Sequence, residues 1–153
     1  MGGDLSNAPR NRPPTLMIQA RKDPMGAHLD RIQVVKGWLA ADGTQHEQIY
    51  NVAWSGARQL AADGSLPPVG NTVDLATASY RNTIGTPQLA TVWTDPDFNP
   101  SLPAFYYVRV LEIPTPRHQV YDAVALGMDP AATGYATTIQ ERAWSSAIWY
   151  SPG

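Results

Sequence analysis

Cysteine is absent from the 153-residue sequence, which excludes disulfide bonds, thiolate metal sites and cysteine nucleophiles. Charge is also scarce, because Asp, Glu, Lys and Arg make up 16% of the residues and the net charge is −2. So small a net charge offers no general attraction to nucleic acids or to anionic membranes. We therefore expect neither of these as a partner.

Long hydrophobic runs are missing as well. No apolar segment approaches the ~20 residues that a membrane-spanning helix needs. The first residues, Met1 to Leu5, lack the basic segment followed by an apolar one that marks a signal peptide. The sequence predicts a soluble protein and leaves its compartment undetermined.

Turn-forming residues are plentiful, with 14 Pro and 12 Gly, and this argues against a helical bundle. Between the turns lie short segments rich in apolar, β-branched and aromatic residues, which are typical of strands. The predicted strands span residues 15–21, 32–39, 48–54, 73–77, 88–94 and 104–113, with one or two terminal strands over 139–144 and 147–150.

Only residues 120–127 show a helical pattern, with Gly127 as its end. The predicted fold is therefore all-β, an antiparallel β-sandwich of the immunoglobulin-like or jelly-roll-like kind with one short helix near 120–127. A chain of this length forms one domain that buries roughly 68–70% of its unfolded surface. We place the sandwich domain at residues 15–153 and an irregular lead-in at residues 1–14.

The clearest local signal is a hairpin, because Asp42-Gly43 separates two strand-like segments. A two-residue turn would place Val34 opposite Asn51, which mixes polar and apolar residues on one face. One extra residue at Gly37 would instead place Val34 opposite Tyr50 and Ile32 opposite Val52. We therefore predict a β-bulge at Gly37, and the alternative is a longer loop with another register.

Asp95, Asp97 and Asn99 imitate the start of a calcium-binding loop, because their oxygens occupy its positions 1, 3 and 5. The resemblance then fails, because Pro100 stands where the loop needs glycine and Tyr106 where it needs a bidentate glutamate. Our interpretation is that Asp95 and Asp97 accept backbone N–H groups within a tight turn. We expect no bound metal and no cofactor.

Nucleophilic and phosphate-binding motifs are not found either. The sequence has no Gly-x-Ser-x-Gly elbow and no glycine-rich phosphate loop. His28, His46 and His118 lack the local spacing of metal ligands. A small hydrolase built from scattered carboxylates and a histidine is the weakest hypothesis; its candidate residues are Asp74, Asp95, Glu112, Glu141 and His118.

Aromatic residues are the remaining functional candidates, with five Trp and seven Tyr. Trp54 and Trp93 lie in apolar strands and are predicted to be core residues. Trp38, Trp149 and Tyr150 are candidates for a surface that binds a ligand or a partner, because exposed aromatic rings stack on sugars and anchor proteins.

Arg109 lies inside the most apolar predicted strand. A buried guanidinium needs partners, so we predict an ion pair with a carboxylate or bonds to several carbonyl groups. Recognition of a ligand is the second interpretation of Arg109.

Four segments are together distinctive of a known protein family; they are residues 30–38, 92–98, 105–117 and 139–144. On these segments the sequence resembles the C-terminal part of bacterial proteins assigned to the domain of unknown function 3604. The likeness extends over nearly the whole chain.

The resemblance has a functional implication. The family is similar to metal-dependent hydrolases of the polymerase-and-histidinol-phosphatase superfamily, whose metal ligands lie upstream of anything in this sequence. None of those ligands can be assigned here, so the resemblance implies a non-catalytic domain that packs on a metal-binding domain. A face left uncovered would favour a homodimer, and the alternative function is a carbohydrate- or ligand-binding module.

Overall fold

The computed structural model describes residues 2–5 and 12–152. Strands account for 41% of the described residues and helices for 8%, which confirms a mostly β fold with one α-helix. Among the described residues, no helix combines the length and the apolar character needed to cross a bilayer.

The larger sheet contains six strands and is built around β3 (Leu29–Leu39) and β6 (Ala104–Glu112), which pair antiparallel. β4 (Gln45–Trp54) forms the edge beside β3, and β9 (Arg142–Trp144) and β10 (Ile148–Tyr150) pair with β6. β1 (Gly3–Asp4) pairs parallel with β10, so the sheet is mixed. This two-residue strand lies within the predicted lead-in, of which residues 6–11 are outside the described part of the chain.

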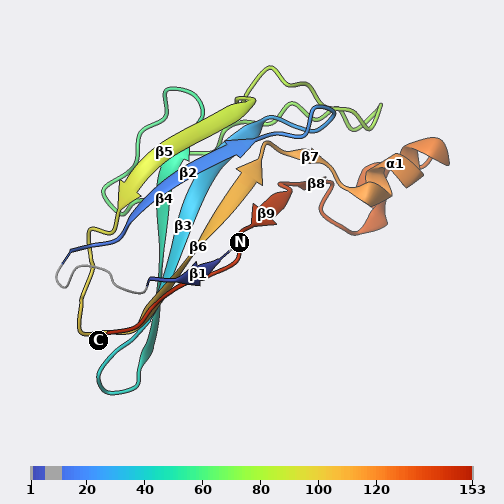
Figure 1. The fold of residues 1–153 in the computed structure, drawn as a ribbon. Coiled ribbons are helices and arrows are strands. Elements are labelled where there is room, and N and C mark those ends of the chain that lie inside the picture. Colours follow the sequence, from blue (N-terminus) through green and yellow to red (C-terminus); the bar gives the residue numbers. More distant parts are fainter. Residues whose placement is uncertain (1, 6–11, 153) are drawn as a thin grey trace.

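A second layer is formed by β2 (Thr15–Arg21) and β5 (Gln88–Thr94), which pair antiparallel and lie across one face of the larger sheet (Figure 1). Both strands have the predicted bounds. Apolar side chains between the layers form the core, because alternate residues of each strand point inward. The buried cluster consists of Ile18, Ile32, Val34, Ala104, Tyr106 and Tyr150, with Trp93 packed against it.

The β3–β4 hairpin corrects one prediction. Val34 does lie opposite Tyr50, but this register begins at the turn and not at Gly37. The turn has a three-residue loop closed by Ala40 and Thr44, and Gly43 adopts a left-handed conformation with φ of 84°. The bulge lies instead at Val52, so Ile32 faces Ala53.

The helix extends the fold at one end, beyond the larger sheet (Figure 1). Helix α1 (His118–Ala125) begins just before the predicted segment. Gly127 ends it with a positive φ and donates to the carbonyl of Val124, while the N–H of Met128 donates to Ala123, which is a Schellman cap.

Short elements flank this helix. β7 (Thr115–Pro116) pairs with β8 (Thr138–Ile139), and a 3₁₀ helix, η1 (Pro130–Thr133), lies between α1 and β8. The predicted strand at residues 73–77 is wrong, because the segment forms a turn closed by reciprocal backbone bonds between Asp74 and Ser79. The alternation of apolar and polar residues in this segment reflects loop side chains that are half-buried.

Gly37 is required for a reason other than a bulge. A Cβ at this position would lie 2.4 Å from the ring of Phe105, its partner on β6. The ring therefore crosses directly over the glycine backbone, where no other residue leaves room.

We predict that Gly37→Ala lowers the free energy of unfolding by ~1–3 kcal/mol, because the Phe105 ring must move. Urea denaturation measures the change. In a Phe105→Ala background the same substitution should cost nothing, because the clash is gone. An equal cost in both backgrounds would show that the ring is not the constraint.

Candidate functional site

A β-bulge places two charged side chains together at the start of β3. Asp30 is the extra residue between Leu29 and Arg31 in the pairing with β6, so the side chains of Asp30 and Arg31 line the same cavity. The Asp30 side chain is 2% exposed. A carboxylate so deeply buried requires charged or polar partners.

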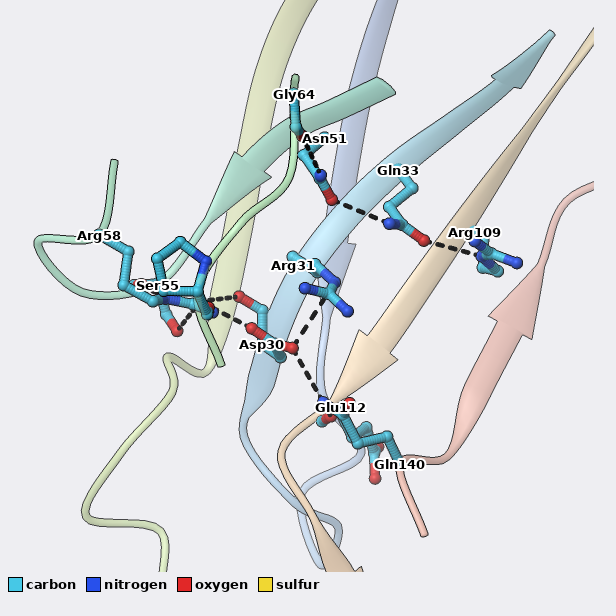
Figure 2. Close-up of polar contacts among 11 residues, drawn as sticks. Asp30, Arg31, Gln33, Asn51, Ser55, Arg58, Gly64, Arg109, Glu112 and Gln140 are labelled. Atoms are coloured by element: carbon cyan, nitrogen blue, oxygen red, sulfur yellow. Dashed lines mark hydrogen bonds and ion pairs between the residues drawn. The ribbon is translucent and has the colours of Figure 1, made fainter. Parts of the chain in front are cut away.

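Arg58 neutralises Asp30 (Figure 2). Its Nη2 lies 2.6 Å from Asp30 Oδ1 and also donates to the backbone oxygen of Asp30. Nε and Nη1 donate to the carbonyls of Ser55 and Pro67. The second carboxylate oxygen accepts from Nε2 of Gln140, which also donates to the carbonyl of Glu112. Asp30 and Arg58 are thus both fully bonded.

Arg31 differs from Arg58. Its Nε lies 3.7 Å from Asp30 Oδ2, which is beyond hydrogen-bonding distance. This atom is the one buried side-chain nitrogen or oxygen without a hydrogen-bond partner in the described part of the chain. The cavity beside it has a volume of about 150 Å³. Its remaining walls are Leu66, Pro68, Val69, Gly70, Pro114 and Gln140.

A separate row of hydrogen-bonded side chains crosses the sheet (Figure 2). Nε of Arg109 donates to the side-chain oxygen of Gln33 at 2.8 Å. Gln33 donates to Asn51, which donates to the carbonyl of Gly64. Within the described residues Arg109 has no carboxylate within ion-pair distance. The predicted ion pair is wrong, because a neutral amide on the neighbouring strand supplies the acceptor.

A second buried ion pair lies between the layers. Lys36 Nζ is 2.6 Å from Asp95 Oδ2, and the side chains are 4% and 0% exposed. The hydroxyl of Tyr106 donates to the same oxygen, and the N–H of Asp97 donates to Oδ1. Burial first, and then the bond to Asp95, raise the pKa of Tyr106, so its hydroxyl stays protonated as a donor.

The residues that imitate a calcium-binding loop have other partners, and Asp95 accepts a backbone N–H within its turn as expected. Lys36 occupies the position beside Asp95 that a cation would take and also donates to the carbonyl of Asp97. The Asp97 carboxylate accepts from the hydroxyl of Tyr50, and Asn99 accepts from the N–H of Ser101. Across residues 2–5 and 12–152, no three His, Asp or Glu side chains are grouped so that they could hold a metal ion.

A large hollow lies on the larger sheet near the end of β3. We call it the aromatic groove; it has a volume of about 550 Å³ and is lined by Gly37, Trp38, Leu39, Gln45, His46, Glu47, Pro103, Ala104, Phe105, Trp149, Tyr150 and Ser151. Phe105 and Trp149 are cross-strand partners with ring centroids 5.2 Å apart. Because Tyr106 and Tyr150 belong to the core, their neighbours Phe105 and Trp149 point away from it.

Three of the four candidate surface residues contribute to the lining of this groove, but Trp38 also packs against the buried core cluster. Trp38 stacks on His46 with centroids 5.1 Å apart, and Trp149 is 53% exposed. Tyr150 contributes to the lining, but its side chain is buried and its hydroxyl donates to the carbonyl of Pro100. Arg109 lies outside the groove, in the row described above.

The hydrolase candidates do not converge. His28 bonds the carbonyl of Ile84 and His118 begins α1, and Asp74 lies in its own turn. Glu112 and Glu141 are neighbours, because the N–H of Glu112 donates to the carbonyl of Glu141. Burial first, and the charge of Glu141 second, raise the pKa of Glu112.

No sequence pattern indicated a site formed by Asp30, Arg58 and Gln140. Asp30 and Gln140 are 110 residues apart and Arg58 lies in an irregular loop, so no spacing links them. Gly64 and Pro67-Pro68 are turn-forming residues of the loop that carries Arg58, but such residues do not reveal which strand the loop returns to.

We predict that Lys36→Met costs ~3–5 kcal/mol of unfolding free energy, because it leaves the Asp95 carboxylate buried without a cation. Chemical denaturation measures the loss. Adding Asp95→Asn to the same chain should restore part of it, because the buried charge is then removed. A loss below ~1 kcal/mol for Lys36→Met would contradict the burial of this pair.

We predict that Glu112→Gln changes the pH dependence of stability. The pKa of Glu112 is higher in the folded state than in the unfolded state. The stability that this side chain contributes is therefore fully present below its unfolded-state pKa, and it is lost as the pH rises through its folded-state pKa. The variant should match wild type near about pH 4 and melt at a higher temperature near about pH 7. Exposed Glu47→Gln is the control, and a constant difference at all pH values would oppose this assignment.

Comparison with known proteins supplies the family. The family model described as "Protein of unknown function (DUF3604)" matches residues 1–152. Neither a curated protein nor a solved structure matches the chain. Because the match covers nearly every residue, the chain belongs to this family of proteins of unknown function.

Proposed function

We propose that this chain is a non-catalytic β-sandwich domain that packs through its aromatic groove on a larger metal-binding domain. The observation that carries the proposal is the exposed ring of Trp149 against half-buried Phe105, on the sheet face that points away from the core. An exposed tryptophan beside an apolar hollow is a common anchor for a protein partner. The domain would be the C-terminal part of a family member related to metal-dependent hydrolases.

The chemistry of the buried carboxylates supports a non-catalytic role. Asp30 and Asp95 each have a cationic side chain within 2.6 Å, so both are committed to structural ion pairs. A general acid or base must instead reach a substrate and exchange its proton. Neither carboxylate borders the aromatic groove.

The composition of the groove favours a folded protein partner. Leu39 is 41% exposed beside Trp149, and Glu47 is the single acidic side chain of the lining. Burying such a surface removes apolar area from water without burying several unpaired charges. A second copy of the chain would use the same residues and form a homodimer.

A carbohydrate-binding module is the second candidate. The groove combines the rings of Phe105 and Trp149 with the polar side chains of Gln45, Glu47 and Ser151. Rings that stack on a sugar face and polar groups that bond its hydroxyls are the requirements of such a site. This candidate uses the same surface and is separated by experiment.

The test measures binding of this chain to the metal-binding domain of a family protein by calorimetry. We expect Trp149→Ala to weaken binding by about 30-fold, since removal of a central tryptophan costs ~2 kcal/mol or more. Met17→Ala is the matched control, because Met17 is 87% exposed on the other layer.

Three outcomes would overturn the packing role. These are no binding by wild type, equal binding by Trp149→Ala, and a concentration-dependent dimer that Trp149→Ala abolishes. A tryptophan fluorescence response to one member of a glycan panel, lost in Trp149→Ala, would instead support the carbohydrate-binding candidate.

A further inference from the structure

We propose that the cavity beside Arg31 is a binding site for a small oxyanion, a carboxylate or a phosphate group. The proposal rests on the contrast between two arginines at the same carboxylate (Figure 2). It concerns a different surface from the aromatic groove and is independent of the proposed function.

The first step is the charge of the site. Asp30 is the one carboxylate that lines the cavity, and Arg58 lies 2.6 Å from it. Arg31 adds a second guanidinium whose nearest carboxylate oxygen is 3.7 Å away. Two guanidinium groups therefore share one carboxylate, and a single anion would balance the excess positive charge.

The second step is hydrogen bonding. Every nitrogen of the Arg58 guanidinium donates to an acceptor of the chain. Nε of Arg31 is buried and has no acceptor among the described residues. A buried N–H without a partner is destabilising, and an arginine side chain is well suited to hold a carboxylate or phosphate by two parallel bonds.

The acceptors already present are not placed to bond this donor, since Oδ2 of Asp30 is 3.7 Å away. Oδ1 of Asp30 is bonded to Arg58, and Oδ2 accepts from Gln140. Gln140 in turn is held by its second bond, to the carbonyl of Glu112. Asp30 is therefore fixed by partners on two other segments, and moving it toward Arg31 would break those bonds.

The third step is size. The cavity volume of about 150 Å³ equals that of engineered cavities that bind benzene, a molecule of about six heavy atoms. A phosphate ion or a short carboxylic acid fits this limit, and a nucleotide does not. Leu66, Pro68, Val69 and Pro114 form apolar walls, and a low local dielectric constant strengthens a charge-assisted bond.

The experiment follows the side-chain Nε–H resonance of Arg31 in the wild-type chain, assigned through its own side-chain carbons. Sodium phosphate and sodium acetate are titrated in separate arms, with sodium chloride at matched ionic strength as the reference. We expect a saturable shift with phosphate or acetate and none with chloride. The arm that responds identifies the oxyanion class.

Arg31→Lys keeps the positive charge and removes the Nε donor, so we expect the half-saturating anion concentration, followed by thermal shift, to rise at least tenfold. Arg21→Lys is the control, because Arg21 is an exposed arginine of β2. Equal responses in both variants, or an unmoved or non-saturating Arg31 resonance in wild type, overturn the proposal. The wild-type titration decides the matter even if Arg31→Lys does not fold.

Discussion

The central strand β3 carries two buried charges, Asp30 at its start and Lys36 toward its end, and the rest of the structure is arranged to neutralise them. Removing a charge from water costs several kcal/mol unless a partner of opposite charge is held close. Arg58 and Asp95 are those partners, each at 2.6 Å. Both lie in loops and not in strands, so the two ion pairs attach loops to the middle of the larger sheet.

These attachments determine where the hollows of the molecule lie. Arg58 holds the carbonyl of Pro67 as well as Asp30, which brings the loop after β4 against the start of β3 and forms one wall of the Arg31 cavity. Lys36 holds the backbone oxygen of Asp97, which keeps the loop after β5 beside the core, where Phe98 packs edge-on against Tyr150. Buried electrostatics thus fix the loops, and the loops shape the sites.

The elements were predictable where a local pattern decides them. β2 and β5 have the predicted bounds because proline or turn residues end each apolar run. The predicted pairing of Val34 with Tyr50 is correct, but it results from the length of the turn and not from a bulge at Gly37. Asp42-Gly43 fits both a two-residue turn and the three-residue loop observed, so the sequence does not distinguish them. The positions of the bulges at Asp30 and Val52 depend on pairing with neighbouring strands, which no local pattern contains.

The candidate sites were less predictable for the same reason. Trp38 and Trp149 were singled out by residue type, and the fold brings both to one groove. Arg109 was expected to pair with a carboxylate, yet the register places the neutral side chain of Gln33 directly opposite it. The network around Asp30 joins segments far apart in the chain, so it is a product of topology, and residue type alone gives no signal for it.

One outer face of the larger sheet is divided into two unlike halves. Near the start of β3 the half is polar, and the bond from Asn51 to the carbonyl of Gly64 holds the chain's own loop over it. Near the end of β3 the half is aromatic, and Trp149 remains 53% exposed. Polar groups are buried at low cost only when their hydrogen bonds are satisfied. The chain's own loop therefore covers the polar half, where it supplies an acceptor. The apolar half needs no specific bonds and gains by contact with any complementary surface, which makes it the half suited to a partner.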